Sequence, residues 1–251
     1  MIVVDIGNTN TVIGIFHKKA LKNSYRLETK SITIFKYLKK NFSKNKIKKI
    51  KLDYNICIIS SVVPRINKKI LTFFKSINIK TIIVSYTNTK KIFNCNIKNH
   101  NQLGSDRIAN SLAAINKYGK NCLVLDFGTA TTFDVIKNKI YEGGIIAPGV
   151  NVSLESLINK TSKLRKIKIS KTNKVVGKNT FEAMQSGFYW GYESLINGII
   201  KKILKEKNYK PTLIMTGGLS YLFKNKVKIK TVYEPYLTLY GLYIIGLNNN
   251  A

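Results

Sequence analysis

Apolar residues follow two kinds of spacing along this chain, and the opening residues show the shorter one. Residues 2–4 are consecutive apolar β-formers, which is typical of a buried strand. Asp5 follows where that strand is expected to end, and Gly7 to Asn10 have the composition of a tight turn. Residues 11–16 are predicted to return as a second strand. The pattern therefore predicts an N-terminal hairpin with a carboxylate and a polar tip.

A hairpin tip of this composition can hold a phosphate group. Gly7 lets the backbone approach an anion, and the turn amides and the hydroxyls of Thr9 and Thr11 can donate hydrogen bonds. Asp5 can hold a metal ion. An ordinary hairpin with a polar tip explains the same residues equally well when they are taken alone.

Beyond the hairpin, short apolar runs alternate with stretches of helical spacing. Strands are expected at residues 25–29, 54–60 and 81–84, and helices at residues 31–49 and 67–76. A polar stretch at residues 88–102 is expected to form a loop. Strands that alternate with helices indicate an α/β domain with a mostly parallel sheet.

A further helix is predicted over residues 103–119, with Ser105 as its N-cap and Gly119 as its C-terminal stop. Asp106 and Arg107 then occupy the first turn, beside the positive end of the helix dipole. Two interpretations stay open. In the first, the two residues are an ordinary charged first turn, which is common in helices. In the second, they are a catalytic acid and an anion-binding group.

The opening pattern occurs a second time. Residues 123–132 align with residues 2–11 at a constant offset of 121, and Asp126 takes the position of the first aspartate. A glycine, a hydroxyl-rich turn and a predicted return strand follow in both copies. An internal repeat is far more specific than one hairpin. It predicts two related α/β halves, residues 1–118 and 119–251, each with a phosphate-type hairpin and an aspartate.

The remainder of the second half continues the α/β pattern. Residues 141–149 are expected to form a glycine-rich loop in which the backbone can approach a ligand closely. A helix is expected at residues 153–164, followed by a polar, lysine-rich surface loop. Residues 211–218 are expected to be a last buried strand that ends in a Thr-Gly-Gly turn, where a nucleotide base or ribose could lie. An apolar helix is expected near the C-terminus.

A long helix is predicted from Thr180 to about residue 207. Its apolar stripe comprises Phe181, Met184, Phe188, Tyr192, Leu195 and Ile199. A stripe of this kind is expected to face the core. Packing against another subunit is the alternative.

The chain carries a formal net charge of +31, which could indicate a nucleic acid or an anionic membrane as partner. However, 39 of its 43 basic residues are lysine and only four are arginine, the residue whose fork reads bases and phosphates. The lysines are spread from position 18 to 230 among many isoleucines and asparagines. We attribute the charge to a drift toward A- and T-rich codons and expect no nucleic-acid partner.

Other features exclude further classes of protein. No apolar run approaches the ~20 residues that span a bilayer, so no membrane partner is expected. The chain enters a strand directly, which argues against a signal peptide. Cys57, Cys95 and Cys122 are widely spaced and show no metal-binding pattern, so they are expected to be reduced, mostly buried thiols. These features predict a cytoplasmic protein.

Acidic residues are scarce, with twelve in the whole chain. Five of them lie in or beside Gly- and Thr-rich turns: Asp5, Asp106, Asp126, Asp134 and Glu142. Most of the others lie in polar, helix-like stretches, where solvation or ion pairing explains them. The acids in turns are therefore the candidates for chemistry.

Two phosphate-type hairpins with carboxylates resemble the actin, sugar kinase and Hsp70 nucleotide-binding architecture, which has two actin-like (ribonuclease H-like) α/β halves around a nucleotide cleft. Within that architecture the chain resembles the type III pantothenate kinases over nearly its whole length. Five motifs carry the resemblance: Asp5-Ile6-Gly7-Asn8-Thr9, Gly104-Ser105-Asp106-Arg107, Asp126 to Thr132, Gly143 to Gly149 and Thr180 to Gly187. Each motif is modest alone, but five in this order and spacing are specific.

The resemblance implies ATP-dependent phosphorylation of pantothenate to 4'-phosphopantothenate, the first step of coenzyme A biosynthesis, by a homodimer. The residues that would cradle the ATP phosphates are Asp5, Ile6, Gly7, Asn8, Thr9, Asn10, Thr11 and Val12, with Asp5 acting through Mg2+. Thr129 would contact ATP, and Asp126 would bind a monovalent cation, K+ or NH4+. The residues that would bind pantothenate are Gly104, Ser105, Asp106, Arg107 and Thr180.

Asp106 would also accept the proton of the primary hydroxyl of pantothenate during catalysis. A carboxylate in the first turn of a helix is a weak base, because the dipole favours its ionised form. A weak base suffices, because the nucleophile needs little deprotonation early in a loose phosphoryl-transfer transition state. Arg107 could serve either the anionic substrate or the γ-phosphate.

The sequence departs from the family pattern at two positions. The family usually has a Tyr seven residues before the Gly of the Gly-x-Asp-Arg motif, where this chain has Ile97, and often a Pro where it has His100. Both positions bear on the acceptor and not on phosphoryl transfer. Two alternatives therefore stay open. One is a catalytically weakened, DNA-binding regulator, and the other is a kinase of the same superfamily with another small alcohol as substrate.

Overall fold

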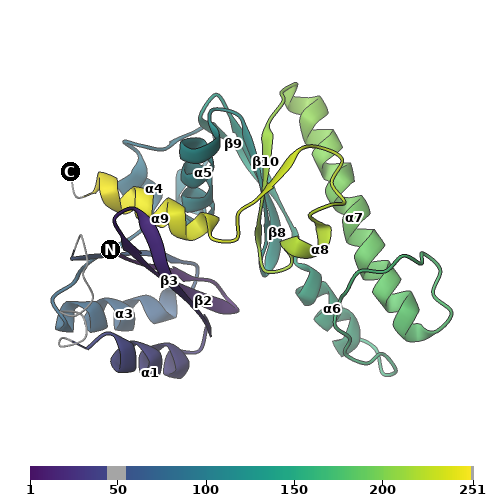
Figure 1. Ribbon diagram of the computed structural model, residues 1–251, viewed down its shortest axis with the longest axis horizontal. Helices are drawn as coiled ribbons and strands as arrows, with labels where there is room; N and C mark the ends of the chain where they lie inside the picture. Colours follow the sequence, from purple (N-terminus) through teal and green to yellow (C-terminus); the bar gives the residue numbers. More distant parts are fainter. Residues whose placement is uncertain (44–54, 250–251) are drawn as a thin grey trace. The chain divides into compact units, whose positions relative to one another are not determined.

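The computed structural model describes residues 1–43 and 55–249 of the chain. Two compact units form, one from Met1–Lys117 with Tyr236–Ala251 and the other from Tyr118–Pro235. Figure 1 shows a sheet and packed helices in each of them. The α/β fold class expected from the sequence is therefore confirmed.

The last helix, α9 (Leu237–Asn248), belongs to the first unit. This division differs from the halves expected at residues 1–118 and 119–251, which put the C-terminal residues in the second half. Gly241 allows α9 to pack closely on the helix that contains Ala109, because a Cβ at position 241 would stand only 1.9 Å from the carbonyl oxygen of Ala109. The two backbones touch at this point.

The first unit is built on a sheet of order β3-β2-β1-β4-β5. Its strands are β1 (Ile2–Ile6), β2 (Asn10–His17), β3 (Ala20–Glu28), β4 (Ile56–Ser61) and β5 (Lys80–Ile83). The first three are antiparallel neighbours, whereas β4 runs parallel to both β1 and β5. The other elements are α1 (Ser31–Asn41), α3 (Pro64–Ser76), α4 (Tyr86–Thr89), β6 (Asn94–Cys95), the 3-10 helix η1 (His100–Gln102) and α5 (Ser105–Tyr118).

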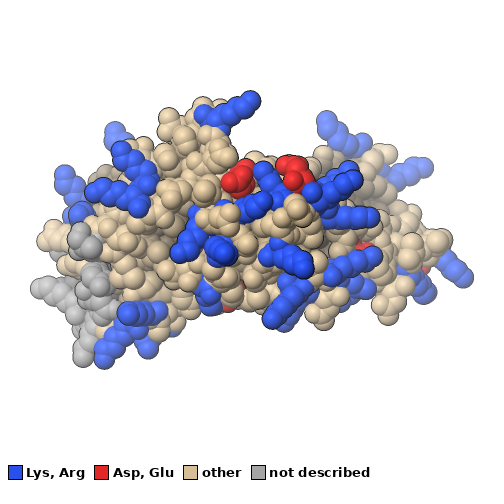
Figure 2. All heavy atoms as spheres, turned by 90° about the horizontal axis from the view of Figure 1, so that it is seen from above, with Lys and Arg blue, Asp and Glu red and all other residues tan. Residues whose placement is uncertain are grey.

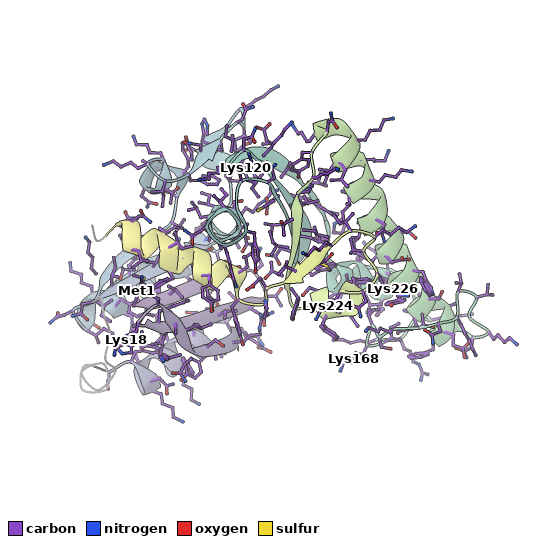
Figure 3. The ribbon with its side chains drawn as sticks, turned by 45° about the horizontal axis from the view of Figure 1, so that its top comes forward. Met1, Lys18, Lys120, Lys168, Lys224 and Lys226 are labelled. Carbon is purple, nitrogen blue, oxygen red and sulfur yellow. The ribbon has the colours of Figure 1, made fainter. Side chains whose placement is uncertain are left out.

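Helices α1 and α3 bury their apolar stripes against one face of this sheet. Ile34 and Leu38 of α1 and Ile70 and Phe74 of α3 are inaccessible to solvent in that core. Helix α9 packs on β1, β2 and β4. Met1, labelled in Figure 3, is also buried, and its amino group donates to the carbonyl oxygen of Phe16 at 2.9 Å. The central strand β1 is therefore held from its first residue.

Several boundaries differ from those expected. Helix α3 begins at Pro64 and not at residue 67, because proline is well suited to the first turn of a helix. Ser105 is the first residue of α5 and not its N-cap. The stretch expected to be a loop contains α4, β6 and η1. Helix α1 ends at Asn41, so residues 42–43 are not helical as expected, and residues 44–49 of the expected helix lie outside the described residues, as does Tyr54.

The second unit repeats the same hairpin arrangement. Five strands of its sheet follow the order β11-β10-β7-β8-β9. They are β7 (Cys122–Phe127), β8 (Ala130–Lys137), β9 (Ile140–Pro148), β10 (Thr212–Gly217) and β11 (Thr231–Tyr233), and the helices are α6 (Val150–Asn159), α7 (Thr180–Lys207) and α8 (Ser220–Phe223). The long helix α7 begins and ends where the sequence predicts.

The predicted repeat is present, but its offset changes at the turn. Ile6 pairs with Thr11 in the first hairpin, and Phe127 pairs with Thr131 in the second. Ile6 and Phe127 are 121 positions apart, whereas Thr11 and Thr131 are 120 apart, so the second turn is one residue shorter. The expectation of a constant offset is wrong, and Thr131, not Thr132, is the counterpart of Thr11.

The apolar stripe predicted for α7 is also partly wrong. Phe181 is 57% exposed, and Phe188 and Leu195 are only half-buried. The residues of α7 that face the core are Met184, Tyr189, Tyr192, Ile196, Ile200 and Ile203. Met184 and Tyr192 belong to both sets, so two overlapping apolar stripes are possible and the sequence pattern does not choose between them.

The thiols largely behave as expected. Cys57 and Cys122 are buried, whereas Cys95 is half-buried. Burial raises the pKa of the Cys57 thiol well above its usual value and that of Cys122 to about 12. None of the described helices is long and apolar enough to cross a bilayer.

We expect Gly241→Ala to destabilise the protein and Gly198→Ala to stabilise it slightly. The added methyl at position 241 would collide with the backbone of Ala109, whereas nothing lies within 4 Å of a Cβ at position 198 of α7. Overpacking costs about 1–3 kcal/mol, whereas alanine favours an open helical site by about 0.5–1 kcal/mol over glycine. Thermal unfolding of both variants measures this difference. Equal Tm values would contradict the described packing of α9 on α5.

Candidate active site

The first hairpin closes through its own backbone. The amide of Gly7 donates to the carbonyl oxygen of Asn10 at 3.0 Å, and the amide of Thr29 donates to the carbonyl oxygen of Thr9 at 2.9 Å. The hydroxyl of Thr11 is buried and lies 3.0 Å from the hydroxyl of Thr29. Of the predicted phosphate-binding groups, Thr11 therefore contacts the residue that follows β3, whereas Asn8 and Thr9 are exposed at the tip of the hairpin.

Hydrogen bonds join the first aspartate motif to the helix that carries Asp106. Asp5 on β1 is the register partner of Ser60 on β4. The hydroxyl of Ser60 lies 3.0 Å from that of Ser105, which also accepts the amide proton of Ser61 at 3.0 Å. The start of α5 is thereby fixed to the end of β4. Asp5 and Asp106 consequently lie at the same edge of the first sheet.

The carboxylate of Asp106 is held by its own helix. Oδ1 accepts the amide proton of Arg107 at 2.9 Å. A Cβ on Gly104 would stand 2.5 Å from the same oxygen, so only glycine leaves room for this side-chain position. One carboxylate oxygen is engaged by the first turn of the helix, and the side chain as a whole is only half-buried. Asp106 is therefore oriented and accessible, as a general base must be.

Two glycines, one just after β9 and one at the end of β10, lie against the second hairpin. A Cβ on Gly149 would stand 2.2 Å from the carbonyl oxygen of Thr129 and 2.7 Å from that of Gly128. A Cβ on Gly217 would stand 2.5 Å from Oδ1 of Asp126. The chain can approach the hairpin this closely only because neither position has a side chain. Of the predicted site residues, Thr129 is therefore packed against the backbone of Gly149, and Asp126 against the backbone of Gly217.

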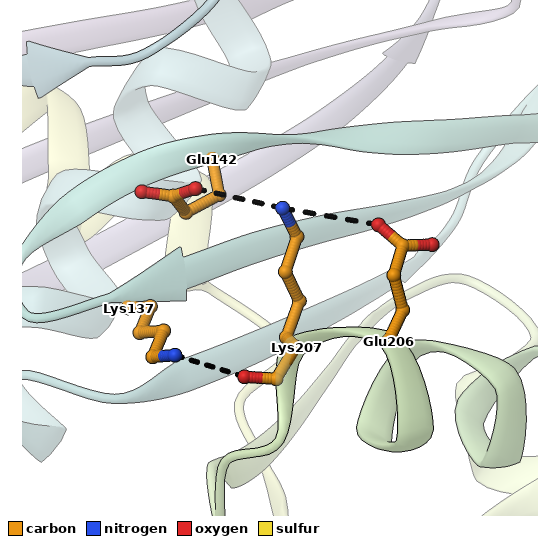
Figure 4. Close-up of polar contacts among 4 residues, drawn as sticks. All are labelled: Lys137, Glu142, Glu206 and Lys207. Atoms are coloured by element: carbon orange, nitrogen blue, oxygen red, sulfur yellow. Dashed lines mark hydrogen bonds and ion pairs between the residues drawn. The ribbon is translucent and has the colours of Figure 1, made fainter.

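Asp134 and Glu142, which were expected in or beside turns, lie within strands β8 and β9 and have structural partners. Asp134 is buried and accepts a hydrogen bond from the hydroxyl of Tyr141 at 3.0 Å. Glu142 lies 3.5 Å from Nζ of Lys207, as Figure 4 shows. Lys137 donates to the carbonyl oxygen of Lys207 at 2.9 Å. The contacts of Lys207 tie the end of α7 to β8 and β9, and the bond between Asp134 and Tyr141 joins β8 to β9. We therefore assign a structural role, and not a chemical one, to Asp134 and Glu142.

Thr180 lies on an open groove of the second unit. The groove has a volume of about 870 Å³ and is lined mainly by apolar residues of α6, α7 and the segment between them. At the start of α7, the side chain of Asn179 accepts the amide proton of Glu182 at 2.9 Å. On the groove wall, the hydroxyl of Tyr192 lies 2.6 Å from that of Ser153. The groove combines an apolar surface with a few fixed hydroxyls.

The segment before α7 is fastened to the helix by side chains that the sequence analysis did not single out. The side chain of Gln185 donates to the hydroxyl of Ser170 at 3.0 Å, and Nε1 of Trp190 donates to the carbonyl oxygen of Lys174 at 3.0 Å. Nζ of Lys226, labelled in Figure 3, lies 4.7 Å from the ring centroid of Trp190. The segment between α6 and α7 is therefore anchored to α7 although it contains no helix or strand.

The two positions that depart from the family pattern lie just before α5. His100 opens η1, and its ring stacks on that of Tyr86 with 4.4 Å between centroids and 17° between planes. Ile97 is half-buried in the preceding segment. The ring of Tyr86 on α4 therefore stacks on the residue that stands where the family often has a Pro. Tyr86 could not be singled out from the sequence, because His100 is 14 residues away and no periodic pattern links the two.

Basic side chains are scattered over the face shown in Figure 2, with few acidic side chains among them. The lysines arise from many elements. This distribution agrees with the interpretation of the charge as compositional drift.

The fold and these motifs define a class. Two α/β units that each carry an aspartate at the end of a strand, followed by a polar turn and a return strand, characterise the actin-like nucleotide-binding kinases. A polyphosphate/ATP-glucomannokinase from Arthrobacter sp. strain KM has a similar fold, with a TM-score of 0.50 at 12% identity, over 99% of this chain and 98% of its own. A Campylobacter jejuni protein described as a Baf family transcriptional activator matches over the full length of both chains, with a TM-score of 0.62 at 21% identity.

Sequence comparison is more specific. A profile of the type III pantothenate kinases matches residues 1–202. The type III pantothenate kinase of Pelagibacter ubique is 40% identical over 250 residues, which cover 96% of each chain. The protein belongs to the type III pantothenate kinase family. Its activity is that of the family, ATP-dependent phosphorylation of pantothenate at the first step of coenzyme A biosynthesis.

Proposed function

We propose that the two units divide the work of this kinase between them. The first supplies the hairpin from Asp5 to Val12 for the ATP phosphates, and Gly104 to Arg107 for pantothenate. The second supplies Thr129 for ATP, Asp126 for a monovalent cation and Thr180 for pantothenate. The observation that carries the proposal is the link from Ser60 to Ser105, because it fixes α5 to the strand next to Asp5.

In this proposal Asp106 accepts the proton of the primary hydroxyl of pantothenate while that oxygen attacks the γ-phosphorus. Its Oδ1 is engaged by the amide of Arg107, so Oδ2 is the oxygen that we assign to the substrate. Positioning supplies most of the effect, because a loose phosphoryl-transfer transition state demands little from the base. Arg107 follows directly and provides a positive charge for an anionic group of either substrate.

The residues present suit the two metal ions that the family implies. Asp5, a half-buried carboxylate at the tip of β1, would hold Mg2+, which favours carboxylate and phosphate oxygens. Mg2+, when bound, neutralises charge on the phosphates. Asp126 would hold K+ or NH4+. We place the enzyme in the cytoplasm, in line with its reduced thiols.

We also propose that the protein is a homodimer that uses the groove beside Thr180. Gly187 and Gly191 lie on this groove, and nothing stands within 4 Å of a Cβ at either position. Close by, Phe181 is 57% exposed and Leu157 is 39% exposed. Apolar surface beside small helical residues suits the close approach of another helix.

The dimer proposal predicts that Gly191→Lys gives a monomer, because a charged side chain would fill the contact. Light scattering across a concentration series measures the mass. Gly198→Ala, on the same helix but away from the groove, should keep the mass of the wild type. A wild-type monomer, or a dimeric Gly191→Lys variant, would contradict the use of this groove.

The kinase assignment is tested by ADP release with pantothenate, glycerol or simple sugars as acceptor, each with and without K+. We expect turnover with pantothenate only. Turnover only with another alcohol would show that the acceptor differs. The presence of Ile97 where the family usually has a Tyr would then be a candidate cause. Specific, salt-sensitive binding of a DNA duplex without turnover would favour the regulatory alternative.

A further inference from the structure

Two short helical elements of the first unit bring a pair of rings together ahead of the Gly104 motif. Tyr86 is the first residue of α4, and His100 is the first residue of η1. Their ring centroids are 4.4 Å apart and their planes differ by 17°, which is a stacked arrangement. Both residues are half-buried. The stack therefore joins α4 to the segment that leads into α5.

Helix α4 gives the ring of Tyr86 a fixed support. Ser85 and Asn88 form a capping box at its start, and Nδ2 of Asn88 donates to the carbonyl oxygen of Ile83 at 2.7 Å. Ile83 is the last residue of β5. Thr89 is buried, and its hydroxyl donates to the carbonyl oxygen of Ser85 at 2.8 Å. Tyr86 thus projects from a turn that is tied to the end of β5.

Hydrogen bonds connect His100 to the start of α5. The carbonyl oxygen of His100 accepts the amide proton of Leu103 at 3.2 Å. Gly104 follows directly, and its carbonyl oxygen accepts the amide proton of Ile108 at 3.1 Å in the first turn of α5. Only Leu103 and Gly104 lie between η1 and α5. A displacement of η1 would therefore move the backbone of Gly104.

The backbone of Gly104 has little room to move. A Cβ at position 104 would stand 2.5 Å from Oδ1 of Asp106, the oxygen that accepts the amide proton of Arg107 at 2.9 Å. On the α5 side, the hydroxyl of Ser105 accepts the amide proton of Ser61 at 3.0 Å. The motif is thus held by hydrogen bonds on one side, and η1 with its stacked ring precedes it on the other.

We propose that Tyr86 and His100 are positioning residues for the acceptor, because their stack holds Gly104 in the conformation that binds pantothenate. The proposal rests on the role proposed above for the Gly104 motif. A contact that preorganises a binding segment lowers the cost of binding, so its loss raises the KM for that ligand. Asp106 keeps its bond to the amide of Arg107, so kcat should be retained. ATP is assigned to a different hairpin, so its KM should also be retained.

Variants that remove or keep a ring test the proposal. His100→Ala and Tyr86→Ala each remove one ring, whereas His100→Phe keeps a ring at the same position and is the conservative variant. Asn101→Ala is the matched control, because Asn101 is an exposed neighbour in η1 and its amide would still donate to the side chain of Asn99, as it does at 3.1 Å. In the double variant, residues that act only through each other should lose no more than in either single variant.

Steady-state kinetics at varied pantothenate and at varied ATP measure kcat and the two KM values. We expect each alanine variant at positions 86 and 100, and the double variant, to raise the KM for pantothenate about fivefold. That change corresponds to about 1 kcal/mol, within the range of an aromatic pair. The KM for ATP and kcat should stay within about twofold of the wild type. His100→Phe and Asn101→Ala should stay within about twofold in all three constants.

Amide hydrogen exchange in the absence of substrates measures the positioning itself. The amides of Leu103 and Ile108 should exchange about fivefold faster in His100→Ala than in the wild type, because the bonds that protect them open more often. The amides of the central strand β4 should keep their wild-type rates. General damage to the fold would change both sets.

A wild-type KM for pantothenate in His100→Ala, or unchanged exchange at Leu103 and Ile108, would overturn the proposal. An equal rise in the KM of Asn101→Ala, or no recovery in His100→Phe, would also overturn it, because the effect would then not belong to the stack. A wild type that does not phosphorylate pantothenate would contradict the proposed function instead. The exchange rates would still decide whether the stack holds Gly104.

Discussion

Asp106→Asn should lower kcat by about two orders of magnitude, the lower end of the range that general-base catalysis contributes, while ATP still binds. Asparagine keeps the size of the side chain, and its amide oxygen can still accept the amide proton of Arg107 as Oδ1 of Asp106 does at 2.9 Å. The variant loses only the group that can take a proton. Single-turnover kinetics with pantothenate and nucleotide titration of the same sample separate the two effects.

An exposed acid provides the control for this variant. The side chain of Glu206 is 76% exposed, and it lies 3.8 Å from Nζ of Lys207. Glu206→Gln removes a carboxylate at a position where ion pairs contribute little, so kcat should be unchanged. A near-wild-type rate in Asp106→Asn would show that Asp106 is not the base.

Gly149→Ala should raise the KM for ATP by roughly one to two orders of magnitude. Its methyl group would stand 2.2 Å from the carbonyl oxygen of Thr129 and must displace the second hairpin. Overpacking against backbone costs about 1–3 kcal/mol, and here that cost falls on the loop that carries Thr129. Steady-state kinetics at varied ATP concentration measure the effect.

Two comparisons make the Gly149→Ala result specific. Its φ of −74° is open to alanine, so backbone strain cannot account for a loss. Gly198→Ala, at an open helical position, should leave the KM unchanged. An unaltered KM in Gly149→Ala would contradict the role proposed for the second hairpin.

Much of the fold follows from local pattern. The strand, turn and return strand around Asp5 were predictable because three apolar β-formers precede a turn of Gly, Asn and Thr. Its repetition at Asp126 predicted two related units. The long helix from Thr180 was predictable because apolar residues recur at helical spacing over about five turns, from Phe181 to Ile199.

What the sequence could not supply depends on contacts between distant segments. The change of repeat offset from 121 to 120 occurs inside a turn, and it is hidden because the strand that follows has two adjacent, chemically identical residues near its start, Thr131 and Thr132. The bond between Ser60 and Ser105 joins residues 45 positions apart. The approach of Gly149 to Thr129 depends on space and not on side-chain type. No periodic pattern encodes these contacts.

The placement of α9 is a further example. Its sequence predicts a buried helix but not the unit that it joins, because an apolar surface on all sides carries no directional signal. The contact of Gly241 with Ala109 shows which unit it joins. Similarly, the choice between the two stripes of α7 was decided by packing.

The central claim is that this chain transfers the γ-phosphoryl group of ATP to the primary hydroxyl of pantothenate. The most direct test is phosphorus NMR of the reaction mixture with ATP, Mg2+, K+ and pantothenate. The account predicts a new phosphate monoester whose coupling to a methylene group identifies the 4'-position, formed in step with ADP. ADP formation without that ester, or an ester on another acceptor only, would contradict it.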